Sequence, residues 1–353
     1  MRAVVWKGVG EMAVEDVPMP KVQVPTDAIV KVTHSGLCGS DLHYYRGYGV
    51  ERWPGFIAGH EVVGYVEEVG QDVKNFNPGD HVVLPFYAAC GECFYCKRGQ
   101  SALCVKCEGF GDGYPGCIDG GQAQYIRVPL ASSTLVQAPT TIAQETLLLM
   151  ADIFPTGYYA ASRFLKNVPD WELDELTVAL VGCGPVGMCA LASAIHLTEG
   201  RARVYAIDSV EPRLEEARRI GAIPLNLNDS PAEKIREATD GRGADVVLEV
   251  VGHADALQLC IDVMRPGGNI SSIGWFQAEM KLHMGNLFDK SPTLAFGTCP
   301  VRSIFEEALE ALAAVQDKVK FLCGKTVPLE EAVESYKLFA DRKVHKLIFL
   351  PHS

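Results

Sequence analysis

The sequence predicts an α/β protein in which a β-rich part is followed by a doubly wound parallel sheet. Short apolar runs separated by Gly and Pro fill the first third of the 353 residues, a pattern typical of a compact β barrel or sandwich. After about residue 150, apolar strands alternate with helix-length segments, as in a parallel sheet covered by helices. A Gly-rich turn joins the first strand and the first helix of this second pattern.

The β-rich part is predicted from three apolar runs. Residues 28–32 alternate weakly, and residues 62–69 (VVGYVEEV) form a strand-like run that is closed by Gly70. The turn at residues 77–80 (NPGD) leads into a third apolar run at residues 82–84. We expect these short strands to form one compact barrel or sandwich.

The second part alternates between strands and helices. Helices are predicted to end near Leu197 and to cover residues 213–220, and residues 305–314 also read as a helix. A closing strand is predicted at residues 346–350. The strands of the parallel sheet are predicted at residues 178–181, 204–207, 246–250 and 270–273. The expected domains are residues 1–155 with 298–353, and residues 156–297.

Composition and charge exclude several classes of protein. The net charge of −12 makes an acidic surface that repels phosphate backbones, so nucleic acid is not an expected partner. Residues 178–195 carry no charge, but Gly182, Gly184, Pro185 and Gly187 would break a membrane-spanning helix. Twelve cysteines without a signal-peptide core predict a reducing, cytoplasmic environment in which thiols bind metal or stay free.

A cluster of cysteines predicts a structural zinc lobe at about residues 88–106. The ferredoxin spacing has three residues before its last cysteine and proline after it, whereas here the gap is seven residues and Val105 follows. Free core cysteines are the alternative, but Lys97 and Arg98 indicate an exposed loop. Four thiolates close a tetrahedral site, so we expect catalysis elsewhere. The expected ligands are Cys90, Cys93, Cys96 and Cys104.

A second set of residues has the chemistry of a catalytic zinc site. Cys38, His60 and Asp152 would supply a thiolate, an imidazole and a carboxylate, and leave a fourth position open. Their two negative charges would balance the zinc dication. Taken singly, a buried cysteine is usually packing, and a glutamate such as Glu61 is usually a surface or supporting residue.

The Gly-rich turn predicts a dinucleotide site. Gly182, Gly184 and Gly187 follow a strand and open a helix, and Asp208 ends the next strand. A carboxylate there accepts hydrogen bonds from an unmodified ribose and repels a 2′-phosphate, so NAD is predicted over NADP, although Arg213 lies nearby in sequence. The remaining expected cofactor-binding residues are Pro185, Val186, Arg213, Val251 and Ile273.

Together these motifs resemble the zinc-containing medium-chain alcohol dehydrogenases over nearly the whole chain. The resemblance implies a GroES-like catalytic domain and a Rossmann cofactor domain, with two zinc ions per chain. It implies hydride transfer between NAD and a primary or secondary alcohol, or an aldehyde or ketone in reverse. The motifs that carry it are Cys38-Gly39-Ser40-Asp41-Leu42-His43, Gly59-His60-Glu61 with Gly64, the four-cysteine lobe and the turn at residues 182–187.

The same resemblance implies roles for individual residues. Cys38, His60 and Asp152 are the implied catalytic zinc ligands, and Glu61 is the neighbouring glutamate that supports the site or binds zinc in some states. Three further residues have implied contacts: Ser40 with the substrate oxygen, His43 at the outer end of a proton relay, and Thr156 beside the nicotinamide.

Two positions depart from the pattern of many relatives. Asp152 stands where many have cysteine, and residues 150–157 look most like the group that includes glutathione-independent formaldehyde dehydrogenase. Gly39 replaces a basic residue that contacts the cofactor pyrophosphate in some relatives. The source of that contact is therefore open.

Several alternatives stay open at this point. A polyol or amino-alcohol dehydrogenase of the same superfamily would use a similar site, whereas a zinc-free quinone or alkene reductase would lack Cys38, His60 and Asp152. A zinc-binding redox sensor is a non-enzymatic alternative, with Cys107 and Cys117 as oxidisable thiols. The resemblance implies a homodimer or homotetramer, and the substrate is not fixed.

Overall fold

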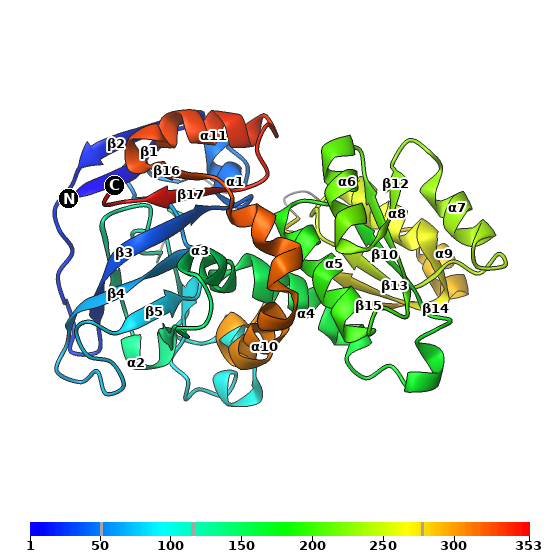
Figure 1. Cartoon of the computed structure of the whole chain (residues 1–353), viewed down its shortest axis with the longest axis horizontal. Helices are drawn as coiled ribbons and strands as arrows, with labels where there is room; N and C mark the ends of the chain where they lie inside the picture. Colours follow the sequence, from blue (N-terminus) through cyan, green and yellow to red (C-terminus); the bar gives the residue numbers. More distant parts are fainter. Residues whose placement is uncertain (50–51, 114–116, 277–278) are drawn as a thin grey trace. The chain divides into compact units, whose positions relative to one another are not determined.

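The computed structural model describes residues 1–49, 52–113, 117–276 and 279–353 (Figure 1). The chain forms two compact units, each with its own sheet. The first unit contains Met1–Asp152, Pro300–Glu306 and Lys320–Ser353, and the second contains Ile153–Cys299 and Glu307–Val319.

The first unit is built on a largely antiparallel sheet in the order β16-β17-β3-β4-β5-β9, with β8 also pairing with β3. Alternate residues of its strands, such as Val30, Val62 and Val82, point into one apolar core because successive side chains of a strand face opposite sides. Its strands are β3 (Ala28–Leu37), β4 (Val62–Val69), β5 (His81–Leu84), β8 (Tyr125–Val128), β9 (Val136–Gln137), β16 (Thr326–Pro328) and β17 (Leu347–Leu350).

Shorter elements complete the first unit. The C-terminal helix α11 (Ala332–Ala340) packs against the hairpin of β1 (Arg2–Gly8) and β2 (Glu11–Asp16), where Tyr336 and Trp6 share one apolar cluster. The other elements are α1 (Asp41–Tyr45), α2 (Ala131–Thr134), α3 (Gln144–Leu147), β6 (Tyr87–Ala88), β7 (Glu108–Gly109) and the 3₁₀ turns η1 (Cys96–Arg98), η2 (Ser101–Leu103), η3 (Leu148–Ala151), η5 (Lys320–Cys323) and η6 (Leu329–Glu331).

The second unit is a six-stranded parallel sheet in the order β12-β11-β10-β13-β14-β15. The chain order therefore reverses between β10 and β13, which is where doubly wound sheets bind ligands. The doubly wound fold predicted from the sequence is confirmed. The strands are β10 (Thr177–Val181), β11 (Arg203–Asp208), β12 (Ile223–Asn226), β13 (Ala244–Glu249), β14 (Met264–Ser272) and β15 (Thr293–Phe296).

Helices cover this parallel sheet. One apolar core joins the sheet to α7, α8 and α9 through residues such as Ile235, Leu257 and Leu287. A β-carbon at Gly157 of α4 would lie 2.5 Å from the backbone nitrogen of Ala190, so only glycine allows α4 and α5 to pack this closely. The elements are α4 (Ile153–Leu165), η4 (Asp170–Glu172), α5 (Pro185–Leu197), α6 (Glu211–Ile220), α7 (Pro231–Glu237), α8 (Ala254–Val263) and α9 (Met284–Lys290).

The long helix α10 (Val301–Val319) belongs to both units. The sequence expectation placed all of residues 298–353 with the β-rich domain, but the structure groups Glu307–Val319 with the parallel sheet. Lys166 forms an ion pair with Glu307 at 2.8 Å, and the ammonium of Lys318 donates to the carbonyl of Ile220 at 3.1 Å. Helical periodicity does not reveal which core a long helix joins, so these contacts were not predictable.

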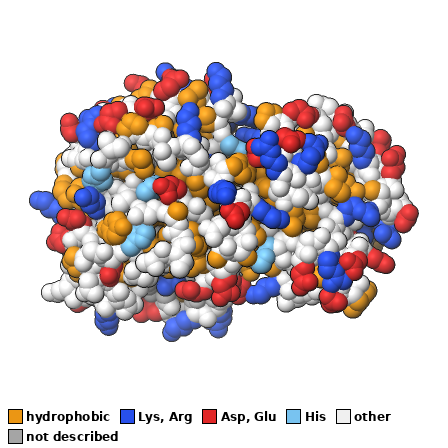
Figure 2. Space-filling view, viewed as in Figure 1, with side chains coloured by type: hydrophobic (Ala, Val, Ile, Leu, Met, Phe, Trp, Pro, Cys, Tyr) orange, Lys and Arg blue, Asp and Glu red, His pale blue; other side chains and the backbone are white. Residues whose placement is uncertain are grey.

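The uncharged stretch at residues 178–195 is divided between β10 and α5, as its glycines and proline predict. In the described ranges, no helix is both long and apolar enough to cross a membrane. Figure 2 shows acidic and basic side chains interspersed over the face in view, without a broad basic patch on that face.

Candidate active site

Four side chains with metal-binding chemistry converge in the first unit. One ligand atom from each of Cys38, His60, Glu61 and Asp152 lies within 4.8 Å of the others. The Cys38 Sγ is 3.2 Å from Asp152 Oδ2, and His60 Nε2 is 3.4 Å from the same oxygen. Cys38 follows β3, and His60 and Glu61 precede β4, which pairs with β3. The ends of two paired strands therefore bring these residues together. Asp152 directly follows η3.

The electrostatics of this group fit a cation. Burial, followed by the carboxylates of Asp152 and Glu61, raises the pKa of the Cys38 thiol to about 11. Burial lowers the pKa of His60, but Asp41, Asp152 and Cys38 outweigh it and hold that pKa well above its ordinary value. A thiolate and two carboxylates this close together need a positive charge between them, and a divalent metal supplies it.

Glu61 is held by a lysine that the sequence analysis did not single out. The Lys346 ammonium is 2.6 Å from Glu61 Oε2 and also donates to the carbonyl of Leu37 at 3.3 Å, and both charged side chains are fully buried. Glu61 Oε1 is buried without a hydrogen-bond partner in the described structure, as expected for an oxygen beside a cation site. A β-carbon at Gly36 would lie 1.7 Å from Glu61 Oε2, so Gly36 makes room for this carboxylate.

Ser40 lies beside the metal-binding group, and His43 follows it in α1. His60 Nδ1 is 3.3 Å from the Asp41 carboxylate, which favours a proton on Nδ1, and His60 Nε2 lies 3.2 Å from Ser40 Oγ. Burial, with Arg52 and Arg46, lowers the pKa of His43 to about 4. His43 is therefore a neutral imidazole at neutral pH.

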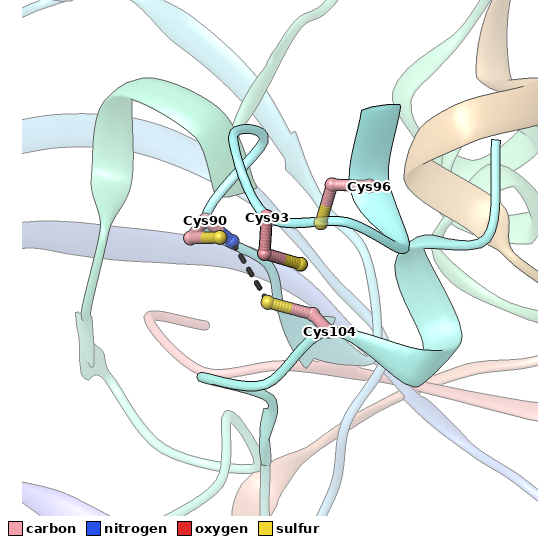
Figure 3. Close-up of side chains that lie close together, drawn as sticks. All are labelled: Cys90, Cys93, Cys96 and Cys104. Atoms are coloured by element: carbon pink, nitrogen blue, oxygen red, sulfur yellow. Dashed lines mark hydrogen bonds between the residues drawn. The ribbon is translucent and has the colours of Figure 1, made fainter. Parts of the chain in front are cut away.

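The four-cysteine lobe forms the second metal-binding group (Figure 3). One sulfur atom from each cysteine lies within 4.8 Å of the others. The backbone N–H groups of Cys90 and Lys106 each donate to Cys104 Sγ at 3.3 Å. Backbone donors at Cys96 and Val105 lower the pKa of Cys93 to about 6, whereas burial raises the pKa of Cys96 to about 12. Four convergent sulfurs suit a tetrahedral zinc ion and leave no position for a substrate.

The three glycines of the turn have different structural roles. Gly182 adopts φ of +101°, which favours glycine, and a β-carbon at Gly187 would lie 2.0 Å from the carbonyl oxygen of Gly182. A β-carbon at Gly184 would meet nothing within 4 Å. Gly184 precedes Pro185, the first residue of α5, so this open space faces the helix N-terminus, where phosphates bind.

Asp208 holds the turn from the end of β11. Its carboxylate accepts the N–H groups of Cys183 at 2.7 Å and Val210 at 2.9 Å, and Arg213 Nη1 lies 3.9 Å away. Sequence analysis predicted a ribose-binding role for Asp208, and the structure adds that its carboxylate orders the Gly-rich turn. Val186 lies inside the first turn of α5 and Thr156 is half-buried in α4.

The ends of β13 and β14 are ordered by Glu249, which the sequence analysis also missed. Its buried carboxylate accepts the N–H groups of Val251 and Gly252 at 2.8 and 2.7 Å and the hydroxyl of Ser272 at 2.7 Å. Val251 is half exposed, and Ile273 directly follows β14. The expected cofactor-binding residues at strand ends therefore share the carboxyl edge of the sheet.

Aromatic residues near the metal-binding group differ in their position. The ring of Phe86 lies 6.2 Å from that of His60, which suits a substrate-side residue. Phe110 is only 1% exposed and belongs to the apolar core. Trp275 of the second unit is 42% exposed.

Two family profiles match this chain. The alcohol dehydrogenase GroES-like domain matches residues 24–140, and the zinc-binding dehydrogenase profile matches residues 185–314. Zinc-type alcohol dehydrogenase B of Aspergillus flavus is 46% identical over 352 residues, which cover 99% of this chain and 81% of the relative. The solved structure of alcohol dehydrogenase TADH from Thermus sp. ATN1 is 36% identical, with a TM-score of 0.91 over 99% of both chains.

The fold and the two metal-binding groups define a zinc-type dehydrogenase of two domains. The chain belongs to the zinc-binding alcohol dehydrogenase family, and the resemblance inferred from its sequence is confirmed. Glutathione-independent formaldehyde dehydrogenase of Bacillus subtilis is 30% identical over 405 residues, which cover 99% of this chain and 97% of the relative. It is less similar than the Aspergillus protein, so membership of that subgroup stays a prediction.

Proposed function

We propose that this protein oxidises a primary or secondary alcohol with NAD, and reduces an aldehyde or ketone in reverse. The observation that carries the proposal is the convergence of Cys38, His60 and Asp152 in a member of this family. Three protein ligands with an open fourth position are typical of catalytic zinc. The four-cysteine lobe would hold the second, structural zinc ion.

The residues of the chain have separate tasks in this reaction. A zinc ion in this group supplies Lewis-acid activation of the substrate hydroxyl. Cys38, His60 and Asp152 would hold the ion, and Glu61 would supply charge beside it. Ser40 would take the hydroxyl proton because a serine hydroxyl accepts and donates at once. His43 would pass the proton to water as a neutral imidazole.

His43 should be useful but replaceable. Water is able to take over the outer end of a proton relay, so His43→Ala should lower kcat by about tenfold, less than the ~10²–10⁴ of an irreplaceable proton-transfer group. Steady-state kinetics at neutral pH with the zinc content verified measure this. An unchanged kcat over the whole pH range would remove His43 from the relay.

NAD is the proposed nucleotide because Asp208 ends β11 beside the Gly-rich turn. A carboxylate at this position favours a free ribose hydroxyl and repels a 2′-phosphate. Arg213 is already 3.9 Å from the same carboxylate, which partly neutralises it. A kcat/KM with NADP⁺ above that with NAD⁺ would reject this assignment.

Two glycine variants separate nucleotide binding from folding. Gly184→Ala adds a methyl group to open space at an ordinary φ of −71°, so the fold should be kept while NADH binding weakens by about tenfold, or about 1.4 kcal/mol. Gly187→Ala should instead destabilise the second unit because its methyl group overlaps the carbonyl of Gly182. NADH fluorescence titration and thermal unfolding measure both effects. Equal loss of stability in the two variants would contradict this division of roles.

A substrate screen tests the proposed function directly. NADH formation is measured with short primary alcohols, secondary alcohols, polyols and formaldehyde, and zinc is counted per chain. We expect two zinc ions and turnover of at least one alcohol. Preference for polyols would favour the polyol dehydrogenase alternative. No hydride transfer with any alcohol, despite two zinc ions, would favour a redox sensor.

Self-association and location are further parts of the proposal. The edge strand β15 pairs on one side with β14, and Phe296 at its end and Phe288 of α9 are 51% and 82% exposed. We propose that a second copy pairs at this edge to form a homodimer or homotetramer, and a monomer in light scattering would exclude this. A cytoplasmic location is proposed because metal-binding thiols persist in reducing compartments.

A further inference from the structure

Four buried polar side chains in contact with one another form a ring next to His60. Tyr44 donates to Asp41 Oδ1 at 3.0 Å, and the hydroxyls of Tyr44 and Tyr336 lie 2.9 Å apart. Tyr336 donates to Gln122 Oε1 at 2.8 Å, and Gln122 Nε2 donates to Asp41 Oδ2 at 3.3 Å. All four side chains belong to residues that are at most 2% exposed.

Asp41 connects this ring to two of the expected metal ligands. Its Oδ1 lies 3.3 Å from His60 Nδ1, and its Oδ2 accepts the backbone N–H of Cys38 at 2.9 Å. A carboxylate in this position fixes the histidine tautomer and the direction of the metal-binding nitrogen. The orientation of Asp41 therefore affects both His60 and Cys38.

Tyr336 closes the ring from a distant part of the chain. It lies in α11, 292 residues after Tyr44, and its single hydroxyl touches both Tyr44 and Gln122. Gln122 is in turn tied to the carbonyl of Gly36 at 3.2 Å. Without the Tyr336 hydroxyl, the buried Gln122 Oε1 would lose its donor and the Tyr44 hydroxyl would lose a polar neighbour.

The surrounding backbone is shaped to admit the ring. Gly59, which precedes His60, has φ of +90°, and a β-carbon there would lie 2.4 Å from Gln122 Cγ. Burial raises the pKa of Tyr44 and of Tyr336 well above the ordinary value, so both remain neutral hydroxyl groups. Apolar packing often stabilises a core as well as a buried polar network does. We therefore expect these four side chains to contribute to the geometry of their neighbours more than to stability.

We propose that Tyr336 is a positioning residue for the metal site, acting through Tyr44 and Gln122 on Asp41 and through Asp41 on His60 and Cys38. This inference rests on the metal site of the proposed function. The C-terminal helix thus contributes to metal retention without touching the metal, and the four-cysteine lobe serves as an internal reference because the ring does not include it.

Metal release from the zinc-loaded full chain tests the proposal. Tyr336→Phe removes one oxygen atom and keeps the packing of the aromatic side chain. It should speed chelator-driven release of one zinc equivalent by about tenfold and leave the second equivalent unchanged, since outer partners of metal ligands contribute about 10–100-fold to metal affinity. Tyr45→Phe is the matched control. The aromatic ring of Tyr45 lies 5.4 Å from that of Tyr336, but its hydroxyl is not one of the groups that contact Asp41 or Gln122.

A second variant and a kinetic measurement keep the test decisive. Tyr44→Phe removes the direct hydrogen bond to Asp41 and should accelerate release of the same equivalent while leaving the second unchanged. In the Tyr336→Phe enzyme, kcat should fall while the KM for NAD⁺ stays unchanged. The proposal would be overturned if the Tyr336→Phe protein released both zinc equivalents at the wild-type rate, or if the release of both were accelerated equally. Failure of the proposed function would appear separately, as a wild-type chain without two zinc ions or without alcohol oxidation.

Discussion

His60→Ala should remove one zinc ion per chain and lower kcat/KM for the alcohol by about a thousandfold or more, equivalent to about 4 kcal/mol of transition-state stabilisation. The imidazole is the one nitrogen ligand among acidic groups, and its Nε2 lies 3.4 Å from Asp152 and 3.2 Å from Ser40. Without it, the proposed ion would lose a ligand and the Ser40 hydroxyl would lose its partner. Cys38→Ser should have the same effect, because a hydroxyl does not supply a thiolate.

Zinc counting and kinetics on the same samples check this result. The His60→Ala protein should keep one zinc ion in the four-cysteine lobe and an unchanged affinity for NADH, since the Gly-rich turn belongs to the other unit. His352→Ala is the matched control, because that histidine is exposed and outside the metal-binding group. Full activity in a His60→Ala or Cys38→Ser protein that has verifiably lost this zinc ion would end the proposed mechanism.

Local sequence rules predicted the elements that carry the site. The run at residues 62–69 is β4 with the same bounds, because alternation and a closing glycine define a strand locally. The turn at residues 182–187 follows a strand and opens a helix, because Gly182 and Gly187 each meet a local steric requirement. Cys38, His60 and Asp152 come together as expected from their motif.

The supporting partners were not predictable by the same rules. Lys346 stands next to an apolar strand, and nothing in its immediate sequence indicates that it is buried against Glu61. Tyr336 lies in an amphipathic helix, where the sequence pattern does not distinguish it from an ordinary core residue. Both contacts join segments more than 280 residues apart, and such pairs depend on the tertiary fold rather than on local periodicity.

The pair of Lys346 and Glu61 should have a large effect on stability. Lys346→Met removes the ammonium that lies 2.6 Å from Glu61 Oε2 and leaves a fully buried carboxylate with both oxygens without a hydrogen-bond partner from the side chains described. Breaking a buried ion pair by removing one partner typically costs about 3–5 kcal/mol. We expect a loss of this size in the free energy of unfolding of the first unit, because methionine keeps the volume but not the charge.

Urea unfolding of the zinc-loaded protein measures this loss against two controls. Lys343→Met removes a lysine whose pair with Asp341 is exposed, so it should change the free energy of unfolding by no more than about 1 kcal/mol. Adding Glu61→Gln to Lys346→Met should restore part of the stability, because the uncompensated charge is then gone. If Lys346→Met is as mild as Lys343→Met, the two charges do not depend on each other. If the double variant is no more stable than Lys346→Met, the loss arises from packing around the lysine stem and not from the stranded carboxylate.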